Sequence, residues 1–129
     1  MTGGPVGKLH DGLGIDAAAC LVSCAMLLNP GAIGAAVIDP WSSVDVRDAL
    51  RSVPPGLGPE KFDRVGWSFR WPNGSWLRVV GAGGGEAEVL RGQDLSVLWL
   101  HEACPSSDGA RLAMLGLRVP PLLEVRSSR

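Results

Sequence analysis

The most apolar segment of the chain, residues 17–28, reads AAACLVSCAMLL. It is rich in helix-forming residues, Asp16 precedes it as a candidate N-cap, and an Asn-Pro-Gly sequence follows it, so the pattern predicts one buried helix. Residues 32–39 form a shorter apolar run that a proline follows, which is typical of a strand buried on both faces. A helix followed by such a strand favours an α/β fold.

Two regions further along mix polar and apolar residues regularly. Residues 42–51 have helical spacing, with Ser42 or Ser43 available as the N-cap, which predicts a short surface helix. Residues 66–80 contain two alternating aromatic runs, GWSFRW and SWLRVV, on either side of a Pro-Asn-Gly sequence. Because Asn-Gly between two such runs is a strong turn signal, this pattern predicts a β-hairpin.

The remaining segments complete the expected order of elements. Residues 93–100 form a nearly unbroken apolar run, which predicts a strand that ends at His101 and Glu102. A short helix is expected over residues 108–117 and a final strand over residues 122–125. The first sixteen residues are rich in glycine and predict a flexible loop.

Composition narrows the class of protein. With 129 residues, of which 46% are hydrophobic and 19% charged, the chain has the size and the apolar content of one packed domain spanning residues 1–129. Twelve basic and thirteen acidic side chains leave a net charge of -1, so the chain as a whole is not a polycation that would bind nucleic acid or anionic lipid. Any surface of that kind would have to be local.

The cysteines and the apolar segment at residues 17–28 indicate in which cellular compartment the protein is expected. Three cysteines without framework spacing favour a reducing compartment over a secreted disulfide scaffold. Residues 17–28 are too few for a membrane span, which needs roughly 20 apolar residues. Asp11 and Asp16 stand where a signal peptide carries positive charge, which argues against export. The sequence therefore predicts a cytoplasmic protein.

A glycine-rich loop with a lysine is the first candidate for chemistry. The sequence TGGPVGKL at residues 2–9 contains Lys8. In nucleoside-triphosphate hydrolases such a loop surrounds the phosphates with backbone N–H groups, its lysine holds the β- and γ-phosphates, and an apolar strand elsewhere brings acidic residues to Mg²⁺ and water. The loop departs from G-x-x-x-x-G-K-[ST], because Thr2 stands at the first glycine and Leu9 at the hydroxyl residue.

Four segments, taken in sequence order, resemble the ATPase domain of the large terminase subunit of tailed phages and prophages. They are SVDVRDAL at 43–50, FRWPNGSWLRV at 69–79, EVLRGQDLSVLWLHEA at 88–103 and GLRVPPLLEVRSS at 116–128. The resemblance covers almost the whole chain from Gly3 onward, and "WPNG" followed by "LRG" and an acidic strand end is more specific than any one piece. It implies an α/β fold with a P-loop NTPase-like sheet, flanking helices and an added β-hairpin.

The resemblance also implies roles for single residues. Gly3, Gly4, Gly7 and Lys8 match the phosphate-binding loop. Glu102 matches the catalytic glutamate that polarises the attacking water.

Other matched positions concern the transition state, the metal and the coupling of hydrolysis to movement. Arg91 matches the arginine of "LRG", a candidate finger that acts on the neighbouring subunit. His101 stands where the family has a Mg²⁺-binding aspartate, and neutral imidazole is a poor ligand for that hard cation. Ser127 and Ser128 fall at the motif that couples hydrolysis to DNA movement.

By the same resemblance, ATP and Mg²⁺ would be the cofactors. Double-stranded DNA, the portal protein, the small terminase subunit and further copies of the chain would be the partners, in the cytoplasm of a bacterial host. The sequence leaves no room for the strand that normally precedes the glycine loop and ends before the nuclease domain of a full-length terminase. We therefore expect an incomplete sheet and very slow or undetectable ATP hydrolysis.

Two other interpretations compete with this one. In the first, the chain is a non-catalytic relic or interaction module that binds no nucleotide. In the second, Cys20, Cys24, His101 and Cys104 supply four ligands suited to Zn²⁺. The zinc and P-loop hypotheses exclude one another, because Cys20 would lie up to ~18 Å from Lys8 if the intervening residues were helical.

Overall fold

The structure of the chain is a computed structural model that describes residues 8–38, 43–64, 67–81, 95–101 and 122–128. Within these ranges it contains a mixed sheet and two helices, so the expected α/β class is confirmed. In chain order the elements are β1 (Lys8–Gly14), α1 (Ile15–Leu28), β2 (Ile33–Ile38), α2 (Ser43–Arg51), β3 (Lys61–Asp63), β4 (Ser68–Arg70), β5 (Trp76–Gly81), β6 (Val97–His101) and β7 (Leu123–Ser128).

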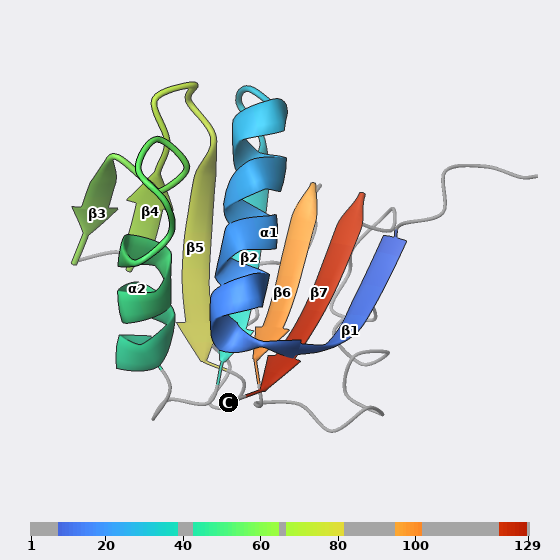
Figure 1. The fold of residues 1–129 in the computed structure, drawn as a ribbon. Coiled ribbons are helices and arrows are strands. Elements are labelled where there is room, and N and C mark those ends of the chain that lie inside the picture. The colour runs from blue at the N-terminus through green and yellow to red at the C-terminus, as the bar shows by residue number, and fades with distance from the viewer. Residues whose placement is uncertain (1–7, 39–42, 65–66, 82–94, 102–121, 129) are drawn as a thin grey trace, which may run out of the picture.

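The strands form one sheet in the order β1-β7-β6-β2-β5-β4-β3 (Figure 1). Five of the strands run parallel to one another, namely β1, β7, β6, β2 and β5. The remaining two, β4 and β3, add an antiparallel edge next to β5. Parallel strands of one sheet require crossover connections, and α1 provides one of them between β1 and β2, which β7 and β6 separate in the sheet. The carboxyl ends of the five parallel strands therefore meet at one edge of the sheet.

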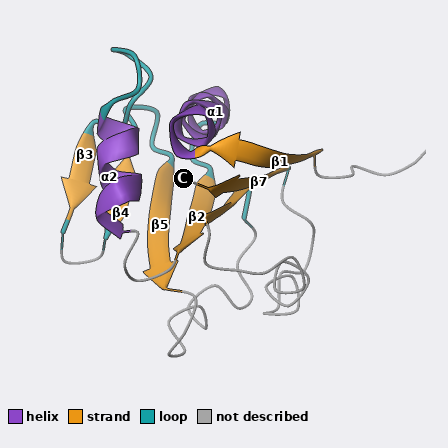
Figure 2. Ribbon diagram, turned by 60° about the horizontal axis from the view of Figure 1, so that its bottom comes forward, coloured by secondary structure: helices purple, strands orange, loops and turns teal. Residues whose placement is uncertain are grey.

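Both helices cover the same face of the sheet (Figure 2). The core between helices and sheet includes Met26 of α1, Leu50 of α2 and Trp99 of β6, all fully or almost fully buried. A second, smaller apolar cluster lies on the opposite face and includes Val37 and Leu100. Because β2 and β6 are apolar on both faces, their sequences read as unbroken apolar runs rather than as alternating ones.

Several expected elements are confirmed with small shifts in their ends. The helices expected over 17–28 and 42–51 are α1 and α2, and the expected hairpin is the antiparallel pair of β4 and β5. The prediction of Asp16 as the N-cap was wrong, because α1 begins at Ile15 and its N-cap is Gly14. The final strand is longer than expected, and the helix expected over 108–117 lies outside the described residues.

The beginning of the chain is where the sequence-based prediction failed. Residues 8–14 were expected in a loop, but they form β1, which pairs with β7. A glycine at positive φ, Gly12 (φ 73°), accommodates a bulge between His10 and Leu13 that would strain other residues. β1 leads directly into α1, whereas the expectation that no strand precedes the glycine-rich loop concerns residues 1–7, which lie outside the described residues.

The turn between β4 and β5 holds the C-terminal end of α1. The Asn73 amide nitrogen donates to the carbonyl oxygens of Met26 (2.9 Å) and Leu27 (3.0 Å) in the last turn of α1, and the Met26 oxygen also accepts the backbone N–H of Asn29 (3.3 Å). Its carbonyl oxygen accepts from the backbone N–H (3.1 Å) and the hydroxyl (2.8 Å) of the buried Ser75. All the hydrogen-bonding groups of the Asn73 side chain are thus engaged, and they connect two distant parts of the chain.

Candidate functional site

The carboxyl edge of the parallel strands is the place where α/β sheets of this type bind ligands. In the register of the sheet, Ile38 of β2 lies beside His101 of β6, His101 beside Ser127 of β7, and Ser127 beside Leu13 of β1. From Leu13 the chain passes through Gly14 into the first turn of α1. The residues at this edge therefore include the N-terminus of α1 and the side chains of His101 and Ser127.

His101, Ser127 and Trp99 form a buried hydrogen-bonded network at this edge. The Trp99 indole nitrogen donates to the Ser127 hydroxyl oxygen at 2.7 Å, and the same oxygen lies 2.7 Å from Nδ1 of His101. His101 and Trp99 are fully buried and Ser127 is 7% exposed. The Ser127 hydroxyl is thus the hydrogen-bond partner of two aromatic rings of β6, and it holds the His101 ring against β7.

These residues do not fit the Mg²⁺ that the resemblance implies. Mg²⁺ takes oxygen ligands in an octahedral arrangement, whereas position 101 offers an imidazole whose Nδ1 is already hydrogen bonded to Ser127. In the described ranges, no three His, Cys, Asp or Glu side chains are grouped so that they could hold a metal ion. The described residues do not support the zinc hypothesis either, because Cys20, Cys24 and His101 are not grouped so that they could hold a metal ion. The fourth expected ligand, Cys104, lies outside the described residues.

The residue expected to hold phosphates lies at the other end of the sheet. Lys8 is the first residue of β1 and pairs with Leu123, which in turn lies beside Val97 of β6. Val97 and His101 are four residues apart on one strand, a distance of about 13 Å at the usual rise of a parallel strand. In the register of the sheet, the backbone of Lys8 and that of His101 therefore lie at opposite ends of these strands.

The junction between β1 and α1, at the carboxyl edge of the sheet, carries other side chains. Gly14 is extended, and Ile15 and Asp16 form the first turn of α1. The Ile15 side chain packs partly against the core, and Asp16 is exposed. A carboxylate in the first turn is stabilised by the helix dipole, and it adds negative charge near the helix N-terminus, where an anion would otherwise be favoured.

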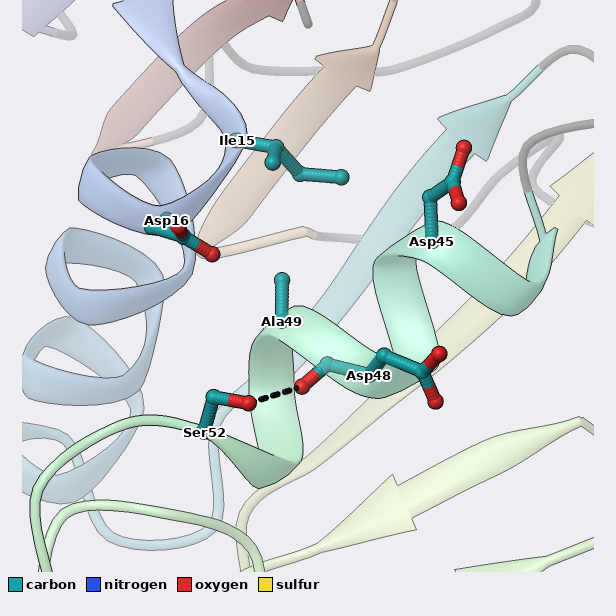
Figure 3. A pocket seen from close by; sticks show the side chains of 6 residues that line it. All are labelled: Ile15, Asp16, Asp45, Asp48, Ala49 and Ser52. Atoms are coloured by element: carbon teal, nitrogen blue, oxygen red, sulfur yellow. Dashed lines mark hydrogen bonds between the residues drawn. The ribbon is translucent and has the colours of Figure 1, made fainter.

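A pocket of about 380 Å³ lies between the first turn of α1 and α2 (Figure 3). Ile15 and Asp16 line it from α1, and α2 with the residue after it contributes Asp45, Asp48, Ala49 and Ser52. The Ser52 hydroxyl donates to the backbone oxygen of Asp48 at 2.8 Å, while the Asp48 carboxylate accepts from Nε of Arg47 at 3.3 Å. With three aspartates in its lining, this pocket disfavours an anionic ligand.

The other residues that the resemblance singles out cannot be located. Gly3, Gly4, Gly7, Arg91 and Glu102 lie outside the described residues. The catalytic role expected for Glu102 and the finger role expected for Arg91 therefore stay predictions.

Sequence reasoning did not find the contacts that organise this edge. Ser127 was assigned only by its place in a family motif, and Trp99 was counted as one apolar residue of a strand. Their contact depends on the register of β6 and β7, in which Trp99 lies opposite Val125 and His101 opposite Ser127. The alternating pattern of β7, with every second residue buried, was the signal that could have placed Ser127 on the inner face.

Comparison with models of known protein families finds no match for this chain, and neither does comparison with curated proteins. Among the described residues, no helix has the length and apolar character of a membrane span.

Proposed function

We propose that this chain is a P-loop-type α/β domain, similar to the ATPase domain of the terminase large subunit, in which the nucleotide site is too incomplete for ATP hydrolysis. The observation that carries the proposal is the junction of β1 and α1 at the carboxyl edge, with β7 and β6 next to it. A P-loop likewise lies where a strand is followed by a helix, although here β1 reaches Gly14 and α1 begins at the next residue.

The order of the elements supports the same proposal. After the junction the chain forms β2, then α2 with its VDVRD sequence, then the hairpin around WPNG, and then two parallel strands. These two strands end at His101 and at Ser127-Ser128, beside the junction. This is the order that the terminase resemblance implies.

The residues at the junction of β1 and α1 explain why hydrolysis is not expected. If Gly14 is the last glycine of G-x-x-x-x-G-K-[ST], Ile15 stands at the lysine and Asp16 at the hydroxyl residue. An isoleucine has no charge for the phosphates, and a carboxylate repels them. His101 stands at the position of the metal ligand, where the Ser127 hydrogen bond engages it. The domain would then take part in the packaging of double-stranded DNA, with the portal protein and the small terminase subunit, without hydrolysing ATP itself.

The acidic pocket favours a second candidate function, an interaction module without nucleotide binding. Asp16, Asp45 and Asp48 line the space beside the helix N-terminus where a nucleotide would have to lie. A surface of this charge suits a cationic group of a partner better than a triphosphate.

Addition of Mg²⁺ and ATP is expected to leave the thermal stability of the protein unchanged. A ligand at 100 times its dissociation constant stabilises a native protein by about 2.7 kcal/mol, which corresponds to a rise in Tm of several degrees in a domain of this size. For this chain we expect a shift below about 1 °C in differential scanning calorimetry at millimolar nucleotide, and no release of phosphate. A rise of several degrees that Lys8→Ala abolishes would contradict the proposed loss of the site.

The genes next to this one test the relation to terminases separately. A packaging function predicts that neighbouring reading frames encode a portal protein and a small terminase subunit. Neighbours that belong to an unrelated operon, with no capsid or packaging genes, would contradict the packaging role and leave the interaction module as the better function.

A further inference from the structure

The face of the sheet that is turned away from the helices carries a cluster of cations at its β3-β4-β5 edge. On the helix side of these strands, Phe62, Phe69 and Leu77 form one row across the sheet. Successive side chains of a strand point to opposite faces. The adjacent row, Lys61, Arg70 and Trp76, therefore lies on the face away from α1 and α2, and Arg78 follows Trp76 on that face by the same alternation.

These side chains are accessible, and their positive charges outnumber the described carboxylates beside them, Glu60 and Asp63. Lys61 and Arg70 are exposed, while Trp76 and Arg78 are half-buried. Two ion pairs join described side chains, Arg47 with Asp48 and Arg126 with Glu124, and neither involves Lys61, Arg70 or Arg78. Asp63 is the one described carboxylate of β3, β4 or β5 on this face, so the positive charges outnumber it.

The fold has separated charges that nearly cancel in the sequence. The net charge of the chain is -1. Asp16, Asp45 and Asp48 surround the pocket on the helix side, whereas the cluster of Lys61, Arg70 and Arg78 lies on the other face. A local cationic surface of this kind attracts polyanions even when the whole protein is slightly acidic.

We propose that Lys61, Arg70, Arg78 and Trp76 form a contact surface for single-stranded nucleic acid. Lys61 and Arg70 are directly opposite each other on neighbouring strands, about 5 Å apart at Cβ, and Arg78 lies diagonally from Arg70 at about 7–8 Å. The three cations would contact successive backbone phosphates, and the indole of Trp76, which lies beside Arg70 on the neighbouring strand, would stack on a base. Surfaces that bind single strands without sequence preference combine these two features.

A single strand fits this surface better than a duplex. Bases of a duplex are already stacked on one another, so they are not available to an aromatic side chain on a sheet. Duplex sequence is read by an element that enters a groove, whereas β3 and β4 are only three residues long and lie flat in the sheet. This inference does not depend on the proposed function, because it uses neither the α1 junction nor a nucleotide.

The test is fluorescence anisotropy of the full chain with a labelled oligothymidine of about 20 nucleotides, which exceeds the ~4–16 nucleotides that one small domain covers. We expect binding at about 50 mM salt, with a slope of log K against log[salt] near -2, because each phosphate contact to a single strand contributes about -0.7. Arg70→Gln combined with Arg78→Gln should reduce the slope to about -0.7 and weaken binding at least tenfold.

Two further variants separate charge from stacking. Trp76→Leu should weaken binding about tenfold with an unchanged salt slope, because it removes a stacked base and no phosphate contact. Arg47→Gln combined with Arg51→Gln removes the same charge from α2, on the opposite face, and should leave binding unchanged. Circular dichroism and Tm confirm that each variant is folded, and Lys61→Gln, at an exposed position, replaces the double variant if that variant unfolds.

The following outcomes would overturn the inference. The first is that the folded wild-type chain does not bind oligothymidine at low salt. The second is that the α2 control loses as much binding as the Arg70/Arg78 variant. The third is that a duplex of the same length binds as tightly as the single strand and Trp76→Leu has no effect. Binding of Mg·ATP without binding of oligothymidine would also overturn it, and would do so independently of the proposed function.

Discussion

Asn73→Ala is expected to lower the free energy of unfolding by about 2–3 kcal/mol, which is a large part of the stability of a small domain. The substitution removes the donor to the carbonyls of Met26 and Leu27 and the acceptor for the N–H and hydroxyl of Ser75. Ser75 is fully buried, so water cannot easily replace the lost acceptor. Urea denaturation followed by circular dichroism measures the change.

Asn29→Ala is the matched control for this prediction. Asn29 lies at the same end of α1, and its amide makes one side-chain bond, to the backbone oxygen of Ala25 at 2.7 Å. Its loss should cost about 1 kcal/mol or less. If both variants lost the same stability, Asn73 would act only as a local turn residue and not as the connection between the hairpin and α1.

Ser127→Ala is expected to lower the free energy of unfolding by about 2–4 kcal/mol. The hydroxyl is the hydrogen-bond partner of both the Trp99 indole nitrogen and Nδ1 of His101, and both rings are fully buried. A buried polar group that loses its partner costs about 1–3 kcal/mol, so the loss of one oxygen affects two groups. Chemical denaturation monitored by tryptophan fluorescence measures this change.

The neighbouring serine provides the comparison. Ser128 is exposed on the same strand, and Ser128→Ala should change the stability by less than about 0.5 kcal/mol. A change in Ser127→Ala as small as that in Ser128→Ala would contradict a buried network that holds His101 against β7.

The elements with strong local signals could be predicted from the sequence. The apolar run and the Asn-Pro-Gly stop of α1, the spacing of α2 and the Asn-Gly turn between β4 and β5 each depend on neighbouring residues. β2 and β6 were recognisable because strands buried on both faces are apolar throughout. These signals were sufficient for the α/β class.

β1 could not be predicted in the same way. Its sequence, KLHDGLG, has low strand propensity, and two glycines favour a loop. The strand is stabilised by pairing with β7, which follows it in the sequence by more than a hundred residues. Once Lys8 was assigned to a loop by its local motif, the junction of β1 and α1 at Gly14 was missed, because it depends on the register of the sheet.

The candidate site was predicted only in part for the same reason. The edge at His101 was correctly expected at the end of a buried strand. Its partners come from β7 and from the N-terminus of α1, so their identity depends on strand order and not on spacing. The proposed surface of Lys61, Arg70 and Arg78 likewise depends on the pairing of β3, a strand of three residues that the sequence did not indicate.

We propose that the phosphate position of this fold is the junction after Gly14, where Ile15 and Asp16 would stand in place of the lysine and the hydroxyl residue. Isothermal titration calorimetry with Mg·ATP on Ile15→Lys/Asp16→Thr, with Ile15→Gln/Asp16→Thr as the control that restores no amine, tests this assignment. We expect no measurable binding by the wild-type chain or the control, and measurable binding by the lysine variant, since a charge-assisted contact of about 1.5–3 kcal/mol strengthens binding roughly ten- to a hundredfold over the control. Binding by the wild-type chain that requires Lys8, together with no gain in the folded lysine variant, would contradict the claim.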